Sequence, residues 1–160
     1  MRAAIVLFVV TCLGVTGCLP ESQVSGAPKP ASKTEAFTGI WIPQSSIAQG
    51  QEQLPEKSSR EMIRLSIVND EYKMYLLTDA VKLEGRLLAA ADFSIDEKAG
   101  TFELVFKDGL KKGEKMHGIY ELSKTTLKIC YAPTDKVRPT KFEAPAGSDA
   151  FCDIWEPTKK

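Results

Sequence analysis

The sequence predicts an all-β fold, namely a single up-and-down antiparallel barrel of about eight strands. The first observation is the stretch Gly118–Tyr131, where apolar and polar residues alternate on both sides of the short turn Ser123–Thr125. This spacing is typical of a half-buried β-hairpin. The second is the run Phe102–Phe106, which alternates in the same way. Sequential antiparallel strands with one apolar face close most economically as a barrel, because closure removes both exposed edges.

The length of the chain leaves room for one domain. Of its 160 residues, about 120 remain once a leader and a linker are set aside, which is enough for a single modest core. We expect a signal peptide at residues 1–17, a tether at residues 18–36 and the barrel domain at residues 37–157.

Residues 1–17 read as an export signal. Arg2 precedes an apolar run from Ala3 to Val10, which continues to Val15 and ends on small residues. The apolar stretch is about 13 residues long, whereas a helix that spans a bilayer needs about 20, so a cleaved signal is favoured over a retained helix.

Cys18 is the expected site of lipidation. The tetrapeptide Val15–Cys18 is similar to the bacterial lipobox, in which the cysteine thiol is acylated and becomes the first mature residue, while Cys12 would be discarded. An ordinary signal peptide that contains a cysteine and is cut elsewhere is the alternative. Several acyl chains together anchor firmly, at about 0.8 kcal/mol per buried CH₂. We therefore expect an exported protein that is lipid-anchored to the cell envelope, periplasm-facing or in the outer membrane of a Gram-negative host.

The tether and the strands follow in chain order. Residues 18–36 are rich in proline and polar residues, with only Leu19 and Val24 as sizeable apolar groups, so a flexible spacer without structure is expected. A short first strand should end at Pro43, before a polar stretch to Ser59. The expected strands are Phe37–Ile42, Met62–Val68, Tyr72–Leu77, Thr101–Phe106, the two arms of the hairpin Gly118–Tyr131, and Phe151–Trp155. The alanines and leucines of Val81–Ala91 would also suit a helix, but Gly85 interrupts it, so a strand that continues to Ile95 is expected there.

Several short motifs resemble one known family. They are Gly39–Trp41, Gln49–Gly50 with Leu54–Pro55, Gly118–Leu122, Thr126–Tyr131 and Arg138–Phe142. Together they resemble an uncharacterised lipocalin-like domain family abundant in planctomycete bacteria, over about residues 37–142. The resemblance implies a lipocalin-like barrel with Trp41 across its closed end, and it implies no activity.

Composition and charge exclude several classes of function. Lys plus Arg and Asp plus Glu both total 21, so no net charge attracts nucleic acid. His117 is the single histidine, so a multi-histidine metal site or a histidine-based triad is not easily built, and a surface position is the expected role of His117. The acidic residues Asp92, Asp96 and Glu103 show no spacing of an acid/base pair, and residues 108–115 lack the spacing of a phosphate-binding loop. We expect no enzyme, no metal and no cofactor.

Cys130 and Cys152 are the two cysteines of the expected barrel domain. They fall near the end of one expected strand and the start of the next, where antiparallel pairing would place them opposite each other. A disulfide would close a loop of about 21 residues and add roughly 3 kcal/mol. Two buried thiols are the alternative.

The barrel interior decides between two functions. An eight-stranded barrel is either filled by its own side chains or holds one small ligand. Arg138 either stacks on Trp41 or binds an anion. The main prediction is an envelope-tethered barrel that binds a small apolar ligand, and the alternative is a non-enzymatic structural or protein-interaction module with partners unknown. The candidate interior or ligand-binding residues are Trp41, Tyr75, Phe102, Phe106, Tyr120 and Arg138.

Overall fold

The computed structural model describes residues 33–79 and 84–158, and their regular secondary structure is nearly all β-strand. The signal peptide, Cys18 and most of the expected tether lie outside the described residues. The elements are η1 (Glu35–Phe37), β1 (Gly39–Ala48), β2 (Gln51–Glu52), α1 (Lys57–Glu61), β3 (Ile63–Val68), β4 (Glu71–Asp79), β5 (Glu84–Asp96), β6 (Thr101–Gly109), β7 (Lys115–Leu122), β8 (Leu127–Pro133) and β9 (Phe151–Pro157).

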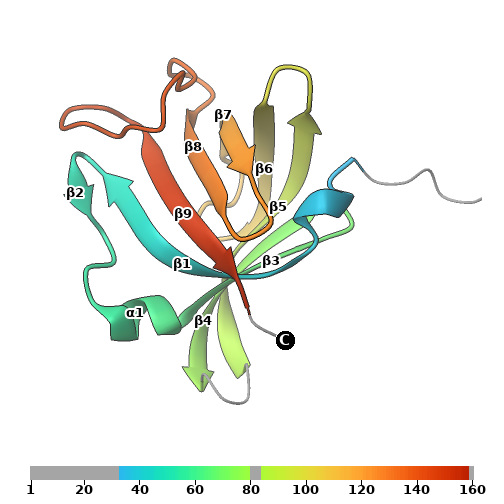
Figure 1. Cartoon of the computed structure of the whole chain (residues 1–160), viewed down its shortest axis with the longest axis vertical. Coiled ribbons are helices and arrows are strands. Elements are labelled where there is room, and N and C mark those ends of the chain that lie inside the picture. The colour runs from blue at the N-terminus through green and yellow to red at the C-terminus, as the bar shows by residue number, and fades with distance from the viewer. Residues whose placement is uncertain (1–32, 80–83, 159–160) are drawn as a thin grey trace, which may run out of the picture. The chain divides into compact units, whose positions relative to one another are not determined.

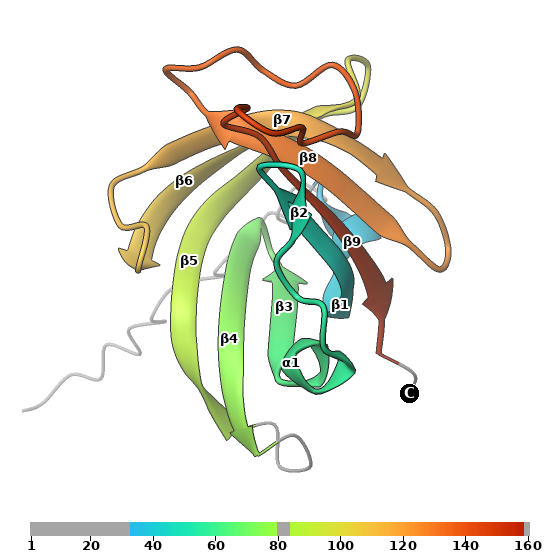
Figure 2. The same ribbon diagram turned by 90° about the vertical axis from the view of Figure 1, so that its left-hand side faces the viewer.

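The strands form a closed barrel, as the sequence predicts. Consecutive strands from β3 to β9 pair antiparallel, β1 pairs with β3 on one side, and β1 also pairs with β9, which closes the sheet (Figure 1). Eight strands make the wall, and β2 adds a short hairpin to the end of β1. Figure 2 shows α1 beside β3 at one end of the barrel. The all-β, up-and-down barrel is therefore confirmed.

β1 is longer than the sequence predicts. The expected strand ends at Pro43, but β1 continues to Ala48, with a shift in its register against β9 between Pro43 and Ser45. Proline lacks the N–H that a regular ladder needs, and a bulge removes that need, so the strand passes through Pro43. The polar stretch that follows contains β2 and the five-residue helix α1. Because α1 buries no side chain, its sequence shows no periodic spacing of apolar residues that would predict a helix.

The expected tether overlaps the folded domain. Residues up to 36 were expected to lack structure, but η1 begins at Glu35, and the side chain of Thr34 is buried. The Thr34 hydroxyl donates a hydrogen bond to Asp70 Oδ1 at 2.5 Å, which satisfies its polar group inside the fold. The domain therefore begins a few residues earlier than the composition indicates.

η1 places an aromatic side chain at one end of the barrel. Phe37 packs edge-on against Phe93 and Tyr120, with ring centroids 5.3 and 5.0 Å apart. The indole Nε1 of Trp41 donates to the Phe37 carbonyl at 3.0 Å. This contact fixes η1 to the first strand, and both Phe37 and Trp41 belong to the core.

Aromatic rings continue from Phe37 through the barrel interior. The ring centroids of Phe93 and Phe102 are 5.8 Å apart, and those of Phe102 and Tyr131 are 6.2 Å apart. Tyr131 in turn stacks on Phe151, with 5.6 Å between the ring centroids. Aliphatic residues and both tryptophans complete the same core. The rings are packed so tightly that a Cβ added at Gly118 would lie 2.7 Å from the Phe102 ring. The barrel is therefore filled by its own side chains.

Candidate functional site

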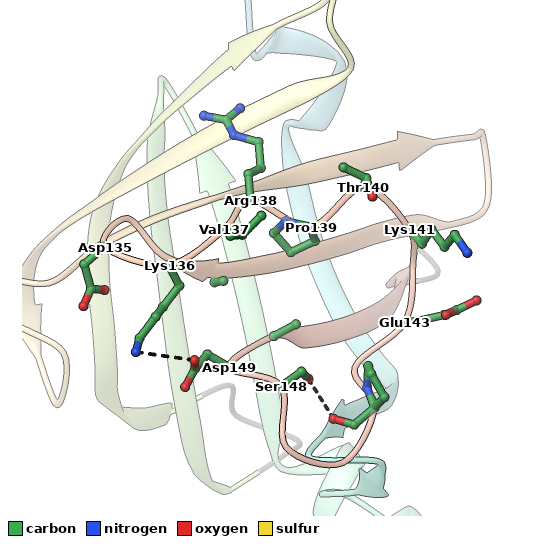
Figure 3. A pocket seen from close by; sticks show the side chains of 13 residues that line it. Asp135, Lys136, Val137, Arg138, Pro139, Thr140, Lys141, Glu143, Ser148 and Asp149 are labelled. Carbon is green, nitrogen blue, oxygen red and sulfur yellow. Dashed lines mark hydrogen bonds and ion pairs between the residues drawn. The ribbon is translucent and has the colours of Figure 1, made fainter.

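The longest connection of the barrel joins β8 to β9. Residues 134–150 contain no helix or strand, whereas connections longer than about 12–15 residues without secondary structure are uncommon and usually functional. They surround a hollow of about 710 Å³, which we call the loop hollow (Figure 3). Its base includes Ala132 of β8 and Ala150, the residue before β9. The loop hollow is therefore the main candidate for a binding site.

The first wall of the loop hollow, residues 135–141, is fastened to the outside of β6 and β7. Arg138 Nη2 forms an ion pair with Glu103 Oε1 at 3.1 Å. The ring Nε2 of His117 forms a hydrogen bond of 3.1 Å with the Lys136 carbonyl. Lys136 Nζ also reaches across to Asp149 Oδ2, 3.6 Å away, as Figure 3 shows. These contacts hold the first wall and tie it to the opposite side.

The second wall, residues 143–150, packs on a disulfide. Cys130 and Cys152 are bonded to each other and lie directly opposite in the β8–β9 register. Ala144 is buried against this disulfide, together with Ile47 and Ile119 of the neighbouring strands. This small cluster lies apart from the core of the barrel, as is common beneath long loops. The disulfide therefore supports the loop as well as the barrel wall.

The lining of the loop hollow mixes apolar and charged residues. Val137 lines it and is 88% exposed, and two prolines, Pro139 and Pro145, contribute further apolar surface. The rim residues carry both signs of charge and are Asp135, Lys136, Arg138, Lys141, Glu143 and Asp149. Such a surface can receive a small apolar group while charged side chains orient its polar part.

A buried polar cluster lies inside the barrel. Asp153 of β9 is 5% exposed and accepts hydrogen bonds from Ser46 Oγ at 2.7 Å and from Tyr131 OH at 3.1 Å. Burial raises the pKa of Asp153 from 3.8 to about 6, against the opposing effect of these two hydrogen bonds. Burial also raises the pKa values of Tyr72 and Tyr131, so both hydroxyls keep their protons. Asp153 has no signal in the sequence, because a lone aspartate in an apolar strand forms no motif.

Four of the six interior candidates belong to the core or pack against it. Trp41, Phe102 and Phe106 belong to the buried core, and Tyr120 is half-buried and packs against it. Trp41, Phe106 and Tyr120 line none of the four hollows described for residues 33–79 and 84–158. Their role in the structure is to fill the barrel.

Two of the interior candidates are corrected. Tyr75 is not among the residues that form the core or pack against it, whereas its neighbour Met74, opposite the buried Leu65, packs against the core. Arg138 does not stack on Trp41, because it pairs with Glu103 on the outside of the barrel while Trp41 is buried. Arg138 instead lines the loop hollow and a neighbouring hollow of about 330 Å³.

The described residues form neither a metal-binding cluster nor a membrane-spanning helix. Within 33–79 and 84–158, no group of three or more His, Cys, Asp or Glu side chains is arranged to hold a metal ion. In the same part of the chain, no helix has the length and apolar character needed to cross a bilayer. His117 lies on the outer face of β7, where it contacts the loop backbone.

Comparisons with known proteins give little. No family model matches the chain, and no curated protein sequence is significantly similar to it. Among solved structures, the chain is similar to one described as "REP1-NXSQ fatty acid transporter", at 12% identity, over 78% of this chain and 97% of that chain, with a TM-score of 0.34. A similarity this low carries no argument about ligands, so the barrel assignment rests on the strand pairing itself.

Proposed function

We propose that the protein is an exported, lipid-anchored and non-enzymatic binding module of the cell envelope. Its barrel is a rigid support, and a small apolar ligand binds outside the barrel, in the loop hollow. The observation that carries this proposal is the contrast between an interior filled by aromatic rings and a hollow of about 710 Å³ under a fastened loop. Ligand sites of about 300–1,000 Å³ are the usual size for small molecules.

The membrane anchor rests on the sequence of the N-terminus. An apolar run of the length of a signal peptide ends at Val15–Cys18, where acylation of the Cys18 thiol would attach the mature chain to a membrane. A protein held at a lipid surface is well placed to receive apolar molecules. The anchor and the hollow therefore support the same kind of function.

A protein-interaction module is the second candidate. The loop hollow is lined by apolar and charged residues, which also occur together at protein interfaces, and Val137 is exposed enough to contact a partner. In that case the loop hollow would receive an apolar side chain of another polypeptide. The site is the same, and the occupant differs.

Site-specific photocrosslinking tests both candidates. A photoreactive amino acid replaces Val137 in the full chain, which is expressed in its own envelope and irradiated there. The control carries the same amino acid at Leu110, which is 81% exposed and lies outside the loop hollow. We expect a small-molecule mass added at position 137 and none at position 110. A protein adduct specific to position 137 would support the interaction module, and equal labelling at both positions would contradict a site at the hollow.

A further inference from the structure

The turn between β1 and β2 has an unusual backbone for its sequence. Gln49 has φ = +54° and Gly50 has φ = +73°, so both central residues of this two-residue turn are left-handed. Hairpin turns of this kind favour Asn-Gly, because asparagine and glycine tolerate positive φ better than other residues. Glutamine at the first position is therefore strained. Strained residues persist where surrounding contacts hold them, and they concentrate at functional sites.

The contacts that hold Gln49 come from the second wall of the loop hollow. Its side-chain Oε1 accepts a hydrogen bond from the backbone N–H of Gly147 at 2.9 Å, and its Nε2 donates to the Ser148 carbonyl. Next to it, the Gly50 N–H donates to the Ala144 carbonyl at 2.6 Å. One carboxamide thus pairs with an N–H and a C=O of adjacent loop residues, as a neighbouring strand would.

The turn backbone itself lies against the loop. A Cβ added at Gly50 would lie 3.1 Å from the backbone nitrogen of Ala146, closer than most side chains approach a neighbour. The second wall is therefore held at its start by the disulfide cluster around Ala144 and along its length by the Gln49–Gly50 turn.

We propose that Gln49 is a positioning residue for the loop hollow, where it sets the conformation of residues 144–148. This inference rests on the proposed function, because it assumes that the loop hollow is the binding site. The length of the side chain explains the choice of residue. Asparagine would fit the turn better, but its carboxamide is one methylene shorter and cannot reach Gly147 and Ser148 from the same backbone position.

Gln49→Asn in the full chain separates this role from simple stability. The variant relieves turn strain, so its melting temperature should stay unchanged or rise. The amide of Gly147 should exchange with solvent about tenfold faster by NMR, because its acceptor is lost. Photocrosslinking from position 137 should fall as well. Gln53→Ala is the matched control, since the Gln53 side chain bonds only to Ala48 and Gln51 in the same hairpin.

The two proposals can fail separately. If Gly147 exchange is unchanged in Gln49→Asn, or if Gln53→Ala accelerates it equally, the positioning role is wrong. If exchange accelerates but no adduct forms at position 137 even in the otherwise native chain, Gln49 does position the loop and the proposed function is wrong. A parallel fall in melting temperature and crosslinking would show that Gln49 supports the fold as a whole, which would also overturn the inference.

Discussion

Asp153 is the residue whose surroundings differ most from those of an ordinary side chain of its type. Its carboxyl group is buried among Tyr131, Tyr72 and the core, and it receives hydrogen bonds from two hydroxyls. Hydroxyl groups stabilise a carboxylate less than a buried cation would, so burial dominates and raises the pKa of Asp153 to about 6. The ionised form is therefore the unfavourable one in the folded protein.

The burial of the Asp153 carboxyl predicts that the free energy of unfolding falls as pH rises. Below about pH 3.8 the Asp153 carboxyl is protonated in both the folded and the unfolded protein, so its effect on stability is small. Between pH 3.8 and pH 6 the carboxyl is ionised in the unfolded chain but still protonated in the folded one, so the free energy of unfolding falls as pH rises. Above pH 6 the full penalty of about 3 kcal/mol is present. We expect Asp153→Asn to gain about 3 kcal/mol relative to the native protein between pH 3 and pH 7.5, measured by urea unfolding.

A second variant checks the cause. The Tyr131 hydroxyl lowers the pKa of Asp153 by donating to it, so Tyr131→Phe should extend the loss of stability to higher pH and make it larger, while its onset near pH 3.8 stays the same. If the difference between Asp153→Asn and the native protein were the same at every pH, the carboxyl would not be the group that titrates.

At the scale of single elements, the β8–β9 loop combines two kinds of support. Its ends are joined by the Cys130–Cys152 disulfide, and its middle is held by contacts with β6, β7 and the β1–β2 turn. A loop without regular hydrogen bonding keeps one shape only when such contacts outweigh the entropy of ordering it. The loop hollow exists because the barrel wall provides these attachment points.

The disulfide should contribute measurably to stability. Its cysteines are 22 residues apart, and on the chain-entropy model a closed loop of this size contributes about 3 kcal/mol. Cys130→Ala with Cys152→Ala should lower the free energy of unfolding in urea by that amount, and the native protein should reach the same value when reduced. Thiol counting on denatured, unreduced protein should find neither cysteine free. Free thiols, or an unchanged free energy, would show that the bond is absent in solution.

Elements with a clear period were predicted well, and those without one were not. The hairpins β3–β4 and β7–β8 follow the alternation and turn residues seen in the sequence. β2 and α1 were missed because two residues and five residues are too short to show a period. η1 was missed because its neighbourhood has the composition of a linker, and only the contacts of Thr34 and Phe37 order it.

At the scale of the whole molecule, the position of the protein in the cell depends on Cys18. In the proposed lipoprotein, Cys18→Ser should remove the incorporation of labelled fatty acid and move the protein out of the membrane fraction. Cys12→Ser is the matched control and should change neither, because Cys12 would be removed with the signal peptide. Unchanged membrane association and labelling in Cys18→Ser would show that the protein is held in another way.

The sequence by itself determined the all-β class, the barrel, most hairpins and the stretch Arg138–Phe142 that lies in the loop. These features depend on local spacing, which a strand of period two displays directly. The sequence did not determine which side of the strand Tyr75 faces. Residues 74–77 are all apolar or aromatic, so their alternation has no visible phase, and only the folded structure shows that Met74 packs against the core and Tyr75 does not.

Only the tertiary structure decided the site. Arg138 meets Glu103, and Gln49 meets Gly147 and Ser148, because barrel closure brings these distant segments together. No local pattern encodes such contacts, since they depend on the register of every strand between the partners. The sequence also did not determine how the interior is packed, because large side chains are consistent with a filled barrel or with a lined cavity. Only their arrangement in space shows that the interior is occupied by Phe37, Phe93, Phe102 and Tyr131.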